Sequence, residues 1–222
     1  MSKYHELFDR NMQLLSEHLR INKIPILRLI YIDKNSEMMS ITLPTSKVLS
    51  SGISRLESIL KNDKLLIPDA STGFSDPSSV HENYCVIANF PEDERSMIQN
   101  KAITCFAKIN IILNNYQNNN LDIFHDFRNE LMLEGIKAGI DIVTHESEDN
   151  RKQSIVIEAD SLLNVADSIH KMRFLTNCVA GSYGKNIDLS SKENTIDLYK
   201  TSGQIILTDF IESNPYLLVK YL

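Results

Sequence analysis

Apolar residues recur at the three- and four-residue spacing of amphipathic helices in five parts of the chain. These parts are residues 4–19, 45–60, 91–116, 121–138 and 161–174. The third begins with Pro91 and three acidic residues, which suit a first helical turn because its N–H groups are unpaired and its dipole end is positive. The pattern therefore predicts five helices, with a further short one after Asn214–Pro215.

Strand patterns lie between these helices, where apolar and polar residues alternate or β-branched residues cluster. Three hairpins are predicted, from residues 26–32 with 39–43, 140–145 with 154–158, and 195–200 with 204–210. Single strands are predicted at 65–68 and 84–90. Residues 69–83 are rich in Asp, Ser, Thr, Gly and Pro, which predicts an exposed loop.

The order of these elements predicts an α+β fold in which antiparallel hairpins pack with amphipathic helices. Each half of the chain has the order helix, hairpin, helix, strands, helix. The polar run Gln117 to Asn120 separates the halves, giving an N-terminal half at 1–118 and a C-terminal half at 119–222. A single compact domain is the alternative, and duplication of one half is a hypothesis because the residues themselves do not align.

Composition favours a folded, soluble, cytoplasmic protein. Of the 222 residues, 42% are hydrophobic and 23% are charged, and the net charge is −6. An acidic surface repels phosphates, so nucleic acid is an unfavourable partner, and other proteins with basic or apolar segments are the expected ones. The charged N-terminus and the lack of a long apolar run predict no secretory signal and no membrane insertion.

Motifs for catalysis, cofactors and metals are missing from the sequence. The three cysteines, Cys85, Cys105 and Cys178, form no C-x-x-C pair, and no two histidines have ligand spacing. Gly181 and Gly184 precede a lysine but lack the spacing of a phosphate loop. No G-x-S-x-G elbow is present. We therefore predict no catalytic, cofactor or metal-binding residues and a chain that is not an enzyme.

The segment His125-Asp126-Phe127-Arg128-Asn129-Glu130-Leu131 resembles the phosphoacceptor box of sensor histidine kinases and histidine phosphotransfer proteins. The resemblance implies that His125 is a phosphorylated nucleophile and that Asp126 orients it. The alternative is an amphipathic helix that turns Phe127 and Leu131 inward and leaves His125 exposed.

Size, acidity and element order together are similar to those of the small acidic chaperones of bacterial secretion systems. The same order also fits roadblock-like scaffolds and ligand-sensing domains. The resemblance implies a non-enzymatic adaptor or chaperone that acts by protein–protein interaction, as part of a hetero-complex. A small-molecule-sensing regulatory domain with an enclosed apolar pocket is the first alternative, and a phosphotransfer protein using His125 is the second.

An apolar C-terminal end is the candidate contact for such a partner. Chain ends are usually polar unless they are docked on something. Packing on the protein's own core is the alternative to partner binding. The predicted partner-binding residues are Tyr216, Leu217, Leu218, Val219, Tyr221 and Leu222.

Overall fold

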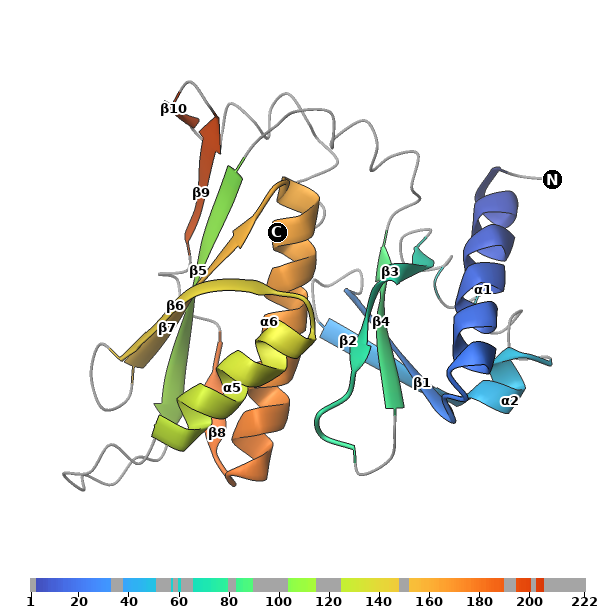
Figure 1. Cartoon of the computed structure of the whole chain (residues 1–222), viewed down its shortest axis with the longest axis horizontal. Coiled ribbons are helices and arrows are strands. Elements are labelled where there is room, and N and C mark those ends of the chain that lie inside the picture. The colour runs from blue at the N-terminus through green and yellow to red at the C-terminus, as the bar shows by residue number, and fades with distance from the viewer. Residues whose placement is uncertain are drawn as a thin grey trace. The chain divides into compact units, whose positions relative to one another are not determined.

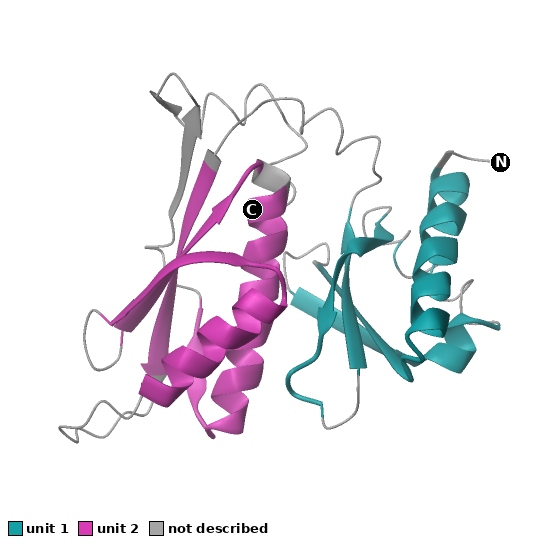
Figure 2. Ribbon diagram, viewed as in Figure 1, with its two compact units in different colours: residues 1–98, 222 teal, residues 99–221 magenta. Residues whose placement is uncertain are grey.

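A computed structural model describes residues 3–32, 38–50, 57, 60, 66–79, 83–89, 104–114, 125–147, 152–189, 195–200 and 203–205. The fold is mixed α+β, as the sequence predicts (Figure 1). The chain forms two compact units, residues 1–98 with 222 and residues 99–221 (Figure 2). This division comes before the one at 118/119 that the sequence suggests, and it assigns all of residues 104–114 to the second unit.

Unit 1 has one four-stranded sheet in the order β2-β1-β4-β3. Its strands are β1 (Ile26–Ile32), β2 (Met38–Pro44), β3 (Ile67–Ser75) and β4 (Asn83–Asn89). The predicted hairpin β1–β2 is confirmed, whereas β1 and β4 pair in parallel. The short helix α2 (Thr45–Val48) follows β2 directly.

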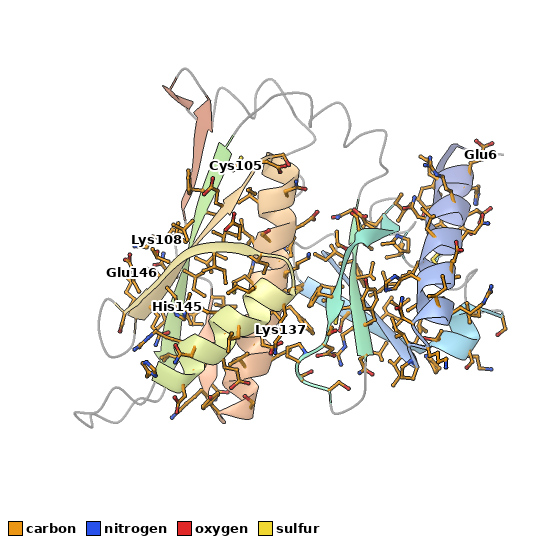
Figure 3. The ribbon with its side chains drawn as sticks, viewed as in Figure 1. Glu6, Cys105, Lys108, Lys137, His145 and Glu146 are labelled. Carbon is orange, nitrogen blue, oxygen red and sulfur yellow. The ribbon has the colours of Figure 1, made fainter. Side chains whose placement is uncertain are left out.

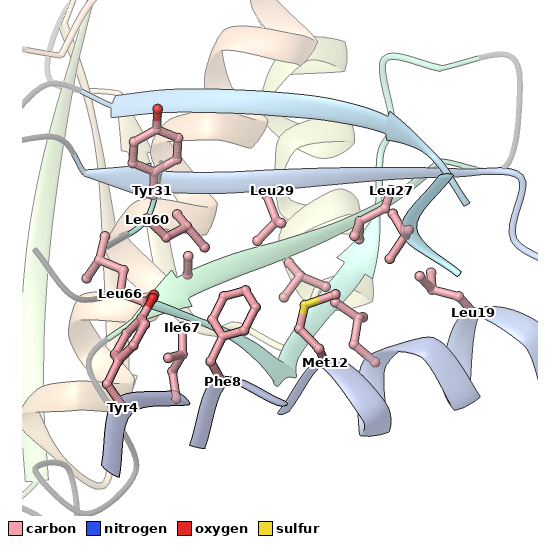
Figure 4. Packing of buried hydrophobic residues seen from close by; sticks show 14 residues of the cluster. Tyr4, Phe8, Met12, Leu19, Leu27, Leu29, Tyr31, Leu60, Leu66 and Ile67 are labelled. Atoms are coloured by element: carbon pink, nitrogen blue, oxygen red, sulfur yellow. The ribbon is translucent and has the colours of Figure 1, made fainter. Parts of the chain in front are cut away.

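Helix α1 (Lys3–Ile21) covers one face of this sheet (Figure 1). Its buried stripe follows the helical spacing read from the sequence, and it meets alternate residues of β1 (Figure 4). The fully or almost fully buried side chains at this contact are Phe8, Met12, Leu15, Leu19, Leu27 and Leu29. The core of unit 1 therefore lies between α1 and the sheet.

Unit 2 has a sheet in the order β10-β9-β5-β7-β6, and β8 also pairs with β5. All the described pairings in this sheet are antiparallel. The sheet of unit 1 contains the parallel pair β1–β4, so the two sheets differ in topology. The strands are β5 (Thr104–Asn114), β6 (Asp141–Ser147), β7 (Lys152–Ala159), β8 (Asn186–Asp188), β9 (Thr195–Lys200) and β10 (Gly203–Ile205). The two C-terminal predicted hairpins are confirmed as β6–β7 and β9–β10.

Two helices, α5 (His125–Lys137) and α6 (Leu162–Ser182), pack against one side of the unit 2 sheet (Figure 1). Both were predicted. The side chain of Ser161 accepts a hydrogen bond from the backbone N–H of Asn164, so Ser161 is the N-cap of α6.

The helix predicted at 91–116 is wrong where the structure describes it, because residues 104–114 form strand β5. The odd-numbered positions Cys105, Ala107, Ile109, Ile111 and Leu113 are buried, which is the two-residue period of a strand. Isoleucines at 109, 111 and 112 favour the extended backbone further. Apolar residues at both odd and even positions fit either period, and sheet pairing decides between them.

The exposed loop predicted at 69–83 is also corrected, because β3 extends to Ser75. The register of β3 against β4 shifts between Asp69 and Phe74, which marks an irregular strand. Polar and glycine residues concentrate at this irregularity, and they produced the loop pattern. The helix predicted after Asn214–Pro215 lies outside the described residues.

Candidate functional site

The unit 2 sheet has a face opposite α5 and α6, which we call the polar face. Adjacent strands place three rows of side chains on it, as their pairing register shows. In the order β5, β7, β6 the rows are Asn110–Ser154–Glu146, Lys108–Val156–Thr144 and Phe106–Glu158–Asp141. Paired side chains on one face lie about 5 Å apart at Cβ, so each row is a set of neighbours.

Two polar residues at the middle of this face are buried. Asn110 is 1% exposed and Ser154 is 0% exposed. The hydroxyl of Ser154 has no hydrogen-bond partner among the described residues, and neither has the buried hydroxyl of Thr144. An unpaired buried hydroxyl is unfavourable by about 1–3 kcal/mol, so these two groups are exceptional within the described part of the chain.

A β-bulge in β6 shapes one side of the polar face. Ile142 pairs with Ile157 and Thr144 pairs with Val156, so Val143 is an extra residue in β6. A bulge of this kind redirects the neighbouring side chains and is frequent beside functional sites. The exposed Val143, at 47% of its full area, lies next to the unpaired Thr144 hydroxyl.

Both signs of charge are present on the polar face. Lys108 and Lys152 are half-buried, Glu158 is half-buried, and Asp141 and Glu146 are exposed. Figure 3 shows Lys108 and Glu146 on the side of the sheet that faces away from α6. Lysine ammonium groups bind phosphates, and carboxylates bind the cations that accompany phosphates. The face therefore has the groups needed to hold a phosphorylated ligand.

Behind this face, a hydrogen bond joins β6 to β7 on the helix side of the sheet. The Nε2–H of His145 donates to Oε1 of Gln153 at 3.0 Å. Burial lowers the pKa of His145 to about 4; the bond with Gln153 opposes that shift, and nearby Arg128 on α5 adds to it. His145 is therefore neutral near pH 7 and holds the two strands together without adding charge.

No three His, Cys, Asp or Glu side chains in the described ranges are grouped closely enough to hold a metal ion. The cysteines Cys85 and Cys105 are buried, and burial raises the pKa of the Cys105 thiol to about 12, helped by the charge of Asp160. Cys105 is therefore a neutral core residue and no nucleophile.

The residues that the sequence proposed for function lie elsewhere. His125 is exposed at the start of α5, with its Nδ1 3.1 Å from Nδ2 of Asn129 and 3.7 Å from the Asp126 carboxylate. The C-terminal residues from Tyr216 to Leu222 lie outside the described residues, and their partner contact stays a prediction. Partners with basic or apolar segments stay a prediction as well.

Sequence reasoning missed the polar face because it depends on β5. If residues 91–116 formed a helix, Lys108 and Asn110 would not pair with strand β7. The rows that bring them beside Ser154 and Glu146 would then not exist. The available signal was the alternation of polar and buried residues in Lys108-Ile109-Asn110-Ile111, which matches a strand.

The fold is similar to that of GmaS. A structure titled "Apo GmaS without ligand" matches with a TM-score of 0.63 and 13% identity, and one titled "GmaS/ADP complex-Conformation 1" matches with 0.59 and 14%. Each match covers 85% of this chain and 57% or 56% of the GmaS chain, so the protein spans little more than half of its neighbour's length. No family model and no curated protein sequence matches the chain.

This likeness overturns the functional prediction made from the sequence. GmaS is an enzyme, so the fold is one that an enzyme uses, and the prediction of a non-enzymatic adaptor or secretion-system chaperone is wrong. The small-molecule-sensing alternative stays a prediction, and the length of α5 argues against the phosphotransfer alternative. In the structure, α5 is a 13-residue helix that packs on a sheet, whereas phosphoacceptor boxes lie on long paired helices.

Across the described ranges, no helix has both the length and the apolar character needed to cross a bilayer.

Proposed function

We propose that this chain is part of an enzyme that binds an adenine nucleotide, ADP or ATP, on the polar face of unit 2. The observation that carries the proposal is the likeness to GmaS over 85% of the chain, including a structure titled as an ADP complex. Because the chain corresponds to 56% of that neighbour, the proposal concerns nucleotide binding and leaves the second substrate open.

The chemistry of the polar face supports this proposal independently of the likeness. Lys108 extends from the middle of the sheet and supplies a positive charge for the phosphates. The Thr144 hydroxyl lies in the same row as Lys108 and the Ser154 hydroxyl in the next row, and neither has a partner among the described residues. Glu146, in the row next to Lys108, supplies a carboxylate for a magnesium ion that travels with the nucleotide. The nucleotide thus brings its own cation and needs no preformed metal cluster.

Calorimetric titration of the full chain with ADP, with and without Mg²⁺, tests the proposal. We expect saturable binding and a Kd about tenfold higher for Lys108→Met, because a hydrogen bond to a charged group contributes about 1.5–3 kcal/mol. Lys137→Met is the matched control, since it removes the same charge from a side chain that is 67% exposed on α5.

Two results would contradict the proposal. The first is that millimolar ADP produces no heat of binding in the calorimeter and no chemical-shift change in NMR spectra of the chain. The second is equal loss of affinity in Lys108→Met and Lys137→Met, which would mean that only the net charge of the chain matters and not the polar face.

A further inference from the structure

A buried lysine of α6 contacts the C-terminal end of α5. Lys171 is 9% exposed, and its Nζ donates a hydrogen bond to the carbonyl oxygen of Ala138 at 3.0 Å. The last carbonyl groups of a helix have no partner within the helix, and the helix dipole makes this end negative. A buried ammonium group at this position therefore satisfies a carbonyl and opposes the dipole.

Lys171 has a companion acid one helical turn earlier. Asp167 is 5% exposed, and its charge favours the charged lysine, although burial as the larger effect lowers the pKa of Lys171. Burying a lysine without support is costly, so the Asp167 carboxylate and the Ala138 carbonyl together make this arrangement possible.

The contact lies at the point where the chain turns from α5 into β6. Gly139 has a φ of +73°, a left-handed value that glycine adopts without strain, and its N–H bonds to the carbonyl of Ile136. The N–H of Ile140 bonds to the carbonyl of Gly135, and β6 begins at Asp141. Only two residues, Gly139 and Ile140, separate Ala138, whose carbonyl Lys171 holds, from the first residue of β6.

We propose that Lys171 is a positioning residue for the polar face. By fixing the end of α5, it sets the place at which β6 enters the sheet, and β6 carries Asp141, Thr144 and Glu146 of that face. The proposal rests on the proposed function where it predicts nucleotide affinity. Small displacements of binding groups weaken ligand affinity because the groups must match ligand atoms in distance and direction.

The test compares three variants of the full chain. Lys171→Met keeps the buried stem but removes the donor and the charge, and Lys171→Arg keeps both. Lys137→Met removes an exposed charge from the same end of α5. We expect the ADP Kd to rise about tenfold in Lys171→Met, and to stay within about twofold of the unchanged chain in the other two.

Affinity is measured at a temperature at which circular dichroism shows each variant fully folded, and amide hydrogen exchange is followed in β6. Faster exchange confined to residues 141–147 together with weaker ADP binding supports the proposal. A lower Tm with unchanged affinity and unchanged β6 exchange overturns it, because Lys171 would then act on stability alone. If Lys171→Met does not fold, Asp167→Asn takes its place, with the same two outcomes at smaller amplitude.

Failure of the proposed function is distinguishable from failure of this inference. If the unchanged chain does not bind ADP, nucleotide binding is refuted, and β6 exchange in Lys171→Met against Lys137→Met then decides the positioning role. Selectively faster exchange in β6 supports that role, and equal exchange overturns it.

Discussion

Single side chains account for two features that the sequence does not display, a neutral buried histidine and an obligatory glycine. His145 lies on β6, on the helix side of the sheet, where partial burial keeps it neutral near pH 7. Gly73 lies in the irregular part of β3, and a Cβ there would collide with the ring and hydroxyl of Tyr84 on β4. Both depend on a neighbour from another strand.

The depressed pKa of His145 predicts a pH-dependent stability. The folded protein binds this proton only near pH 4, whereas the unfolded chain binds it near the usual value of 6.5. The contribution of His145 to the free energy of unfolding is therefore fully present above pH 6.5. It is lost as the pH drops towards 4, by up to about 3 kcal/mol. Urea unfolding of the unchanged chain and of His145→Gln should diverge across this window. His125→Gln, at an exposed site, should follow the unchanged chain, and equal slopes for all three would refute the prediction.

The Gly73→Ala substitution should destabilise unit 1 by about 1–3 kcal/mol, since the added methyl group overlaps the Tyr84 ring. In a Tyr84→Ala background the same substitution should have a much smaller effect. The control is Gly181→Ala in α6, where a Cβ has no heavy atom within 4 Å and alanine favours the helix. Thermal unfolding of the double-mutant cycle measures the coupling, and additive effects would argue against the contact.

At the scale of elements, an ion pair joins β1 to the segment that follows β3. Arg28 Nη1 lies 3.1 Å from Oδ2 of Asp76, whose side chain is fully buried. The other carboxylate oxygen accepts hydrogen bonds from the N–H and the hydroxyl of Ser78 at 3.0 and 2.6 Å. One carboxylate therefore fixes both the turn after β3 and its attachment to β1.

Asp76→Asn should lower the free energy of unfolding by about 3 kcal/mol, because it removes the charge of a fully buried carboxylate that pairs with Arg28. Glu134→Gln, which breaks the pair with the exposed Lys137, should change it by less than about 1 kcal/mol. Chemical denaturation of both variants provides the comparison. Similar losses in the two would show that burial of Asp76 does not strengthen its pair.

For the molecule as a whole, the GmaS-like fold changes the meaning of the acidic composition. The net charge of −6 argued against phosphate-bearing partners. The arrangement of unit 2 places Lys108 and Lys152 among the carboxylates of Asp141, Glu146 and Glu158 on one face of a sheet, so a lysine can meet a phosphate there although the total charge is negative. Total charge describes the average surface, whereas binding depends on the charges within a few ångströms of the ligand.

The sequence by itself determined the α+β class, the helices α1, α5 and α6 and the hairpins, because these follow from local periodicity. Tertiary structure alone decided that residues 104–114 are a strand, since their pattern fits both periods and pairing with β7 and β9 stabilises the extended form. It also decided the polar face, because Lys108, Ser154 and Glu146 come together only when β5, β7 and β6 align in register.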